Sequence, residues 1–446
     1  MGLFGRKKKI DTSENNKHLN DNNPDIRFGR FTDMNKSQEQ LQHWNNCMSL
    51  FKQGNHKQGL VHFLQYIYDK KQDNVSWKED NEKIIFDIIQ GSKIIHGYAD
   101  DKEFVAESFI ASFDKPSIPV MRKLMTLNYS MKYSWFAIQD NKLCMKYTTD
   151  FRHASPYQLF DALKELATQV DKQDDLLINE FDSLHQIEAA PIKEISLDEK
   201  EIKYNFLIKS INESLNEIKK LDEEKHSGAI SYNLLSLIYK LDFLLSPEGV
   251  LTNTLEGIHT LYFRKPPQGQ KVNYIELNRK MIAEIEKIIH IPKDDIFKSF
   301  YVTKETFSVL VPANYKKIAD FIFNESKNFD YYYNNRMDYV NLWICEYIAG
   351  YCLFIYGMYP PLYNLMKLYM KIFNNQYFKD LGFNQNFLSD NILNKKEIEL
   401  AIDAIVKDAR KDYPNFNFNK SMLKYDSLVS FSVSFFKEFD FLNFSK

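Results

Sequence analysis

The chain has 446 residues, enough for two to four domains of ordinary size, which excludes a single small module. Its 58 basic and 60 acidic side chains nearly balance at a formal charge of −2, so the whole chain lacks the basic excess of a nucleic-acid-binding protein. With 14 glycines and 13 prolines beside 35 phenylalanines and 27 tyrosines, it has few helix breakers and many bulky core residues. Its four scattered cysteines form no C-x-x-C pair and no secretory leader is recognisable, so we expect a reducing cytoplasm.

Residues 1–36 are polar and contain few apolar side chains. Near the start, Leu3 and Phe4 precede the basic residues Lys7, Lys8 and Lys9, a cluster too short to cross a bilayer. One interpretation is weak contact with an anionic membrane surface, where each basic residue contributes about 1 kcal/mol. The alternative is a solubilising terminus. The asparagine- and aspartate-rich remainder predicts a disordered or loosely docked arm up to residue 36.

Residues 37–187 are predicted to form an α+β domain. Ser37 and Gln40 match a capping box, and apolar residues at spacings of three and four then indicate a helical hairpin. From residue 75 the apolar period changes to two, which indicates strands. We expect a five-stranded antiparallel sheet with strands at 83–89, 94–98, 104–110, 133–138 and 143–147. Further helices are expected to begin near Pro119 and Pro156.

Two segments of this domain are MRKLMTLNYSMKYSWFAIQDNKLCMKY (121–147) and SPYQLFDALKELATQVDKQDDLL (155–177). Together with the order of the elements, they resemble the YbjN domain, a relative of the type III secretion chaperone fold, over residues 38–185. The matching positions are Arg122, Leu127, Asn128, Tyr133, Phe136, Ala137, Leu143, Asp174 and Asp175. These are packing motifs, so the resemblance bears on fold more directly than on activity.

The resemblance implies a non-enzymatic domain of the bacterial cytoplasm, with a twisted antiparallel sheet backed by helices. Members of the wider fold commonly form dimers and hold partly unfolded client segments. A protein partner or client, or a second copy in a homodimer, is therefore the kind of partner that we expect.

The second half of the chain has a different pattern. Residues 188–200 are polar and contain Pro191, which predicts a linker. Residues 201–446 show the 3.6-residue period of amphipathic helices, so a mostly helical domain is expected. Its most apolar stretch, residues 339–362, contains Glu346, and its charge-free part has the length of a buried core helix rather than of a membrane span.

Motifs for chemistry are absent from the sequence. It contains no Walker loop, no H-E-x-x-H and no G-x-S-x-G, so we expect neither an enzyme nor a cofactor nor a metal site. Glu346 is the carboxylate whose apolar surroundings would suit a general acid or base. The alternative is a structural side chain that hydrogen-bonds a tyrosine or faces a water-filled seam.

Aromatic residues in or beside the predicted sheet are better candidates for binding, because aromatic side chains are enriched at protein interfaces. These candidates are Trp77, Tyr98, Tyr133 and Trp135, and the alternative for them is a place in the core. The favoured function is a protein-binding or chaperone-like adaptor that does not bind nucleic acid. One alternative is a structural component held at the inner membrane face by the N-terminal basic segment. Another is an enzyme with an unrecognised site in the helical domain.

Overall fold

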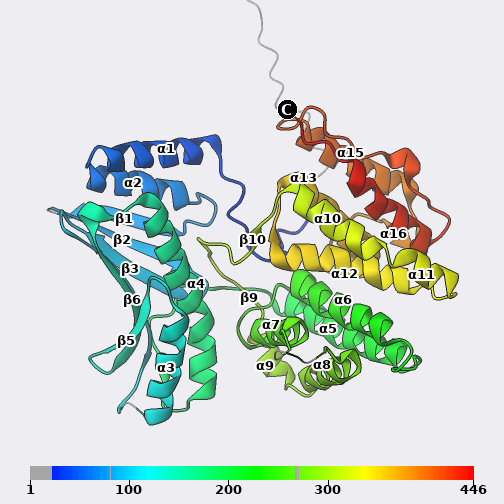
Figure 1. The fold of residues 1–446 in the computed structure, drawn as a ribbon, viewed down its shortest axis with the longest axis horizontal. Helices are drawn as coiled ribbons and strands as arrows, with labels where there is room; N and C mark the ends of the chain where they lie inside the picture. The colour runs from blue at the N-terminus through cyan, green and yellow to red at the C-terminus, as the bar shows by residue number, and fades with distance from the viewer. Residues whose placement is uncertain (1–22, 81, 116, 267–268, 270, 446) are drawn as a thin grey trace, which may run out of the picture.

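The computed structural model describes residues 23–80, 82–115, 117–266, 269 and 271–445 (Figure 1). An antiparallel sheet with its covering helices lies beside a larger body that is built almost entirely of helices. The fold is therefore α+β followed by a helical region, as the sequence predicts.

A helical hairpin precedes the sheet. The hydroxyl of Ser37 accepts a hydrogen bond from the backbone N–H of Gln40, and the Gln40 side-chain oxygen accepts one from the backbone N–H of Ser37. This capping box starts α1 (Gln38–Lys52), and α2 (His56–Ile67) packs against α1. The predicted hairpin is confirmed.

Six strands form one antiparallel sheet in the order β1-β2-β3-β4-β6-β5, and a seventh, β7, pairs with β4. Their bounds are β1 (Val75–Asp80), β2 (Lys83–Gln90), β3 (Lys93–Ala99), β4 (Glu103–Ser112), β5 (Trp135–Gln139), β6 (Lys142–Asp150) and β7 (His185–Gln186). The five predicted strands are all present, but the expected count was too low. β1 was missed because its second half, Lys78 to Asp80, is charged and hides the alternation.

In the part of the chain that the structure describes, helices cover one face of the sheet, and residues along β2 alternate between buried and partly exposed. Phe86 and Ile88 point into the core, whereas Ile85 and Asp87 face the open side. α4 (Pro156–Glu180) crosses the covered face of β2, β3, β4 and β6, and α3 (Ile118–Ser130) packs beside β5. α4 begins where Ser155 caps it and proline occupies the first turn, as predicted.

The helical body surrounds two central helices, α6 (Ser227–Leu245) and α12 (Val340–Ile355), which pack closely on each other. A Cβ atom on Gly350 would lie 2.7 Å from the Cβ of Tyr239, so a larger residue would force these helices apart. α12 is the apolar stretch noted in the sequence, and it is buried in the core as predicted. Among the described residues, no helix combines the length and apolar character needed to cross a membrane.

The remaining helices of this body pack around that centre. They are α5 (Leu197–Ile218), α7 (Gly249–Phe263), α8 (Tyr274–Ile289), α9 (Lys293–Phe297), α10 (Tyr315–Ser326), α11 (Phe329–Asn334), α13 (Pro360–Phe373), α14 (Asn375–Asp380), α15 (Lys395–Ala409) and α16 (Leu428–Lys437).

The chain passes between the two bodies more often than the predicted division implies. Within residues 188–200, expected as a linker, β8 (Lys193–Glu194) pairs with β9 (Tyr301–Val302), and α5 already begins at Leu197. After β9 the chain returns to the sheet, where Phe307 is fully buried in the core of the α+β domain. Residues 304–307 therefore pack with the first domain, although they follow the predicted boundary by about a hundred residues.

The expected disordered arm is wrong for residues 24–36, which we call the strap. The strap contains no helix or strand, yet it lies against the helical body, and Phe28 is only 5 % exposed. Its polar composition concealed three side chains with partners far along the chain, Arg27, Phe28 and Arg30. Residues 1–22 lie outside the described residues, and the membrane-contact candidates Leu3, Phe4, Lys7, Lys8 and Lys9 are among them.

Candidate functional site

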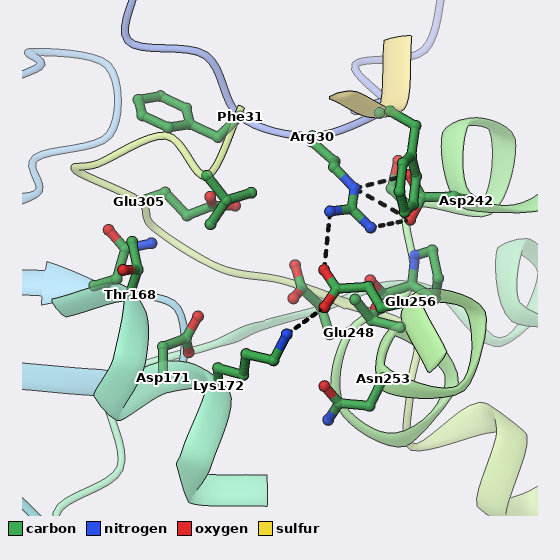
Figure 2. Close-up of a pocket in the computed structure, with 18 of the residues that line it drawn as sticks. Arg30, Phe31, Thr168, Asp171, Lys172, Asp242, Glu248, Asn253, Glu256 and Glu305 are labelled. Atoms are coloured by element: carbon green, nitrogen blue, oxygen red, sulfur yellow. Dashed lines mark hydrogen bonds and ion pairs between the residues drawn. The ribbon is translucent and has the colours of Figure 1, made fainter. Parts of the chain in front are cut away.

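A cavity of about 510 Å³ lies between the two bodies (Figure 2). Its walls come from the strap, the β2–β3 turn, α4, the end of α6 with the loop and α7 that follow it, residues 301–311 and the end of α12. Charged and hydroxyl side chains dominate these walls, and Phe31 and Phe354 supply apolar surface. The cavity is therefore polar and is assembled from segments distant in sequence.

Arg30 of the strap lies on one side of the cavity, next to Asp242 and Glu256 (Figure 2). Phe354 also contacts it, and we call Asp242, Glu256 and Phe354 together the Arg30 cage. Its Nε donates to Oδ2 of Asp242 at 3.0 Å, and its Nη2 donates to Oδ1 of the same carboxylate at 2.8 Å. Its Nη1 donates to Oε1 of Glu256 at 2.9 Å, and its guanidinium lies 3.8 Å from the centre of the Phe354 ring. Burial works to lower the pKa of Arg30, but the two carboxylates outweigh it and raise that pKa.

The Arg30 cage also links the two bodies. Lys172 of α4 donates to Oε2 of Glu256 at 2.7 Å, so one carboxylate on α7 receives a cation from the strap and another from the sheet domain. Burial works to raise the pKa of Glu256, but Arg30 and Lys172 together hold it below its usual value. The Glu256 carboxylate therefore stays charged around neutral pH.

α4 presents Thr168, Asp171 and Asp175 to the cavity, because residues three and four apart share one face of a helix. Oδ1 of Asp171 accepts a hydrogen bond from the backbone N–H of Ser92 at 2.8 Å. The preceding Gly91 has φ +57, and a Cβ there would lie 1.8 Å from that oxygen. Only glycine lets the β2–β3 turn approach the carboxylate this closely.

Three carboxyl groups on the cavity wall have raised pKa values. Burial raises the pKa of Asp171 to about 8, and nearby Glu305, Asp175 and Asp174 add to the effect. Burial and the charge of Glu305 raise the pKa of Glu248 to about 8. Burial also raises the pKa of Asp175 to about 6, and the charge of Asp174 adds to this effect. Asp171 and Glu248 are therefore largely protonated at neutral pH and can both donate and accept hydrogen bonds.

A neutral histidine completes the wall on the side of the helical body. The Nδ1 of His259 lies 2.7 Å from the hydroxyl of Tyr239. Burial, and then the positive charge of Arg30, lower the pKa of His259 to about 4. Within the described part of the chain, no three histidine, cysteine, aspartate or glutamate side chains are arranged to hold a metal ion.

The four aromatic candidates from the sequence do not form one site. Trp77 and Tyr133 are partly buried and pack against the core of the sheet domain. Tyr98 lies opposite Ile85 on the open face, where its hydroxyl donates to Glu103 at 3.0 Å. Trp135 lies at the start of the edge strand β5, opposite Lys146, and is 39 % exposed.

Glu346 lies on α12, away from the interdomain cavity. Its Oε2 is 3.4 Å from Nζ of Lys240, and both side chains are mostly buried. The pair borders a separate cavity of about 670 Å³ beside α5 and α14. The tyrosine hydrogen bond expected for Glu346 is absent from the described contacts, and a lysine takes its place.

An exposed apolar stripe on α3 was not anticipated. One face of this helix, with Val120 and Leu124, is buried, but another face is also apolar. Its exposed members and their exposed fractions are Ile118 69 %, Met121 40 %, Met125 71 % and Tyr129 94 %. The spacings of three, four and four residues were readable from the sequence, but a helix with apolar residues on both faces does not reveal which face is buried.

Next to this stripe, α3 closes the edge of the sheet. The Asn128 side chain donates from Nδ2 to the carbonyl of Phe136 at 3.0 Å and accepts from its N–H at 2.6 Å. Because β5 is an edge strand, these backbone groups would otherwise be available to another strand. Asn128 therefore blocks strand addition at the middle of β5.

Compared with known proteins, the chain matches no protein-family model and no curated protein sequence. The resemblance to the YbjN domain therefore stays a prediction from the sequence motifs and the order of elements.

Proposed function

We propose that the protein is a non-enzymatic, chaperone-like adaptor of the bacterial cytoplasm that binds another protein through its sheet domain. The observation that supports this proposal is the apolar stripe of Ile118, Met121, Met125 and Tyr129, with Trp135 exposed on the adjoining strand. We call these five residues the α3 surface.

The α3 surface has the composition of a protein interface. Exposed apolar side chains scattered singly are ordinary, but a continuous row on one helix marks a surface that is covered by a partner. Methionine and aromatic residues are enriched in such surfaces, because they adapt to partners or supply large contact areas. The row extends over a helix of 13 residues, which is about 20 Å in length.

The neighbouring edge favours side-chain packing over strand addition. Since Asn128 occupies the N–H and carbonyl of Phe136, a partner gains little from pairing with β5. A helix or an apolar segment laid along α3 can bury the whole row. A second copy of this chain and a different protein are both partners of this kind.

Substitution of the α3 surface tests the proposal. Met125→Glu places a charge at the centre of the row, whereas Thr126→Glu places the same charge on the same exposed helix beside it. We expect Met125→Glu to abolish recovery of partners from native lysate, and any concentration-dependent dimer seen by light scattering, while Thr126→Glu leaves both intact. Equal recovery of partners by both folded variants and the wild type contradicts the proposal.

The alternative at a membrane surface makes a different prediction. If Leu3, Phe4 and the lysines that follow hold the protein at the inner membrane face, deletion of residues 1–10 moves it from the membrane fraction to the soluble fraction. An unchanged distribution eliminates this alternative.

A further inference from the structure

The strap is held in the way that a bound peptide is held. Residues 27–31 read Arg-Phe-Gly-Arg-Phe, two arginine–phenylalanine pairs joined by glycine. This stretch has no internal secondary structure, and its contacts are made by side chains and by a few backbone groups of distant residues. We call the residues that receive it the strap site: Asp242, Glu256, Phe354, Phe243, Phe378 and Glu305.

Phe28 is the apolar contact of the strap. Its ring centre lies 4.9 Å from that of Phe378 and 6.4 Å from that of Phe243, inside the core of the helical body. The hydroxyl of Tyr363 donates to the Phe28 carbonyl at 3.3 Å. The strap site thus recognises an aromatic side chain together with its backbone.

Gly29 lets the strap approach α6 closely. Its N–H donates to the carbonyl of Phe243 at 2.8 Å. Its φ is +71, and a Cβ would lie 2.7 Å from the Phe243 ring. A side chain at this position is excluded by both the backbone conformation and the space.

Arg30 and Arg27 supply the charged contacts. The side chain of Asp242 is only 4 % exposed, and its carboxylate holds the Arg30 guanidinium by two parallel hydrogen bonds. Arg27 forms an ion pair with Glu305, on the loop that returns to the sheet domain. A lysine cannot reproduce the two-pronged contact, because its ammonium group is a single point of charge.

We propose that the strap site is a binding site for an arginine–aromatic segment of a partner protein, and that residues 27–31 are a resident intramolecular ligand which such a segment displaces. When the strap leaves, Asp242 becomes a buried carboxylate without a cation, and the Phe28 pocket is emptied. Both losses favour the entry of another segment with the same pattern. This site lies in the helical body except for Glu305 and is separate from the α3 surface, so the two proposals stand or fall independently.

The covalent attachment of the strap to the chain determines how its replacement by a free peptide can be observed. A segment held in the same chain acts at an effective concentration in the millimolar range, so a free peptide at about 100 µM competes poorly with an intact strap. Weakening the contacts of the strap, without changing the strap site, should therefore reveal binding of the free peptide.

The experiment uses the full chain and a fluorescent nine-residue peptide of residues 25–33 (DIRFGRFTD). We expect no anisotropy change with the wild type at about 100 µM and saturable binding to the variant with Phe28→Ala and Arg30→Ala. Asn35→Ala, an exposed strap residue, serves as control and should behave as the wild type. A peptide with lysine in place of Arg30 should bind at least about tenfold more weakly.

Two outcomes overturn the proposal. One is a folded double variant, as judged by circular dichroism and gel filtration, that binds no peptide. The other is equal binding of the arginine and lysine peptides, which shows nonspecific attraction. If the double variant does not fold, the single Arg30→Lys variant replaces it, because it retains the charge and Phe28. The proposal is equally overturned if this folded variant binds the arginine peptide no more tightly than the wild type does.

Discussion

Gly91 and Asp171 show how single residues position the cavity wall. The turn between β2 and β3 reaches α4 only because Gly91 has no side chain, and Asp171 accepts the Ser92 N–H across that short gap. The same approach removes Asp171 from water, which raises the pKa of its carboxyl group. One glycine therefore sets both the packing of the turn and the protonation of the site.

Gly91→Ala should lower the free energy of unfolding by about 2–4 kcal/mol, because it combines an unfavourable backbone angle with a collision against the Asp171 carboxylate. Gly54→Ala is the matched control. Gly54 also has a positive φ, +78, but no described atom lies within 4 Å of its Cβ position, so only about 1 kcal/mol is expected. Urea unfolding measures both variants, and equal losses would show that the contact with Asp171 is unimportant.

The raised pKa values of Asp171 and Glu248 predict how stability depends on pH. Their ordinary values in an unfolded chain are 3.8 and 4.5, against about 8 in the folded protein. Below about pH 4 both states hold these protons, so the groups cost nothing. As the pH rises toward 8, the unfolded chain ionises while the folded protein does not, and the free energy of unfolding falls.

Asp171→Asn should therefore be more stable than the wild type at pH 8 and should flatten the decline between about pH 5 and pH 8. The amide oxygen of asparagine can still accept the hydrogen bond from Ser92. Asp161→Asn, at an exposed position of the same helix, should leave the slope unchanged. Thermal unfolding at constant ionic strength measures the slopes, and an Asp171→Asn variant whose stability changes with pH as that of the wild type does contradicts the assignment.

Among the elements, those specified by short-range signals were predictable from sequence. Ser37 with Gln40 and Ser155 with a following proline set the starts of α1 and α4, since capping contacts act within four residues. β1 was missed because its pairing with β2 stabilises a charged segment that has little strand pattern of its own. The exposed face of α3 was missed because periodicity alone does not distinguish two apolar faces.

The contact of Asn128 with the edge strand β5 can be tested by substitution. Asn128→Ala removes both hydrogen bonds to Phe136, so we expect a loss of about 1–3 kcal/mol in the free energy of unfolding. It also frees the backbone groups at the edge of β5, so two copies of the protein should associate by pairing their β5 strands. Thr126→Ala, on the exposed side of α3, serves as control. Urea unfolding and sedimentation at rising concentration measure the two effects, and a variant that matches the control in both would show that Asn128 does not protect the edge.

At the scale of the whole molecule, the candidate site could not have been predicted, because most of its walls come from segments that lie far apart in sequence. Arg30, Lys172 and Glu256 meet only after the strap, the sheet domain and the helical body have come together. The strap itself looked disordered because local composition does not register contacts with residues more than two hundred positions away. The same long-range contacts make the two bodies interdependent.

Phe307 tests which of the two bodies the returning loop stabilises. It lies in the returning loop of the helical half, yet it is fully buried in the sheet-domain core, with its ring centre 5.5 Å from that of Phe160. Phe307→Ala should cost about 3–5 kcal/mol, as expected for an emptied aromatic site.

The location of the effect distinguishes a shared core from a passive linker. Hydrogen exchange should show lost protection first in α4 and β2, next to the emptied site, while α6 and α12 at the centre of the helical body stay protected until global unfolding. Val309→Ala, at an exposed position of the same loop, should leave exchange in both bodies unchanged. Protection lost first in α6 and α12 would mean that the returning loop stabilises the helical body rather than the sheet domain. The assignment of this loop to the sheet domain would then be wrong.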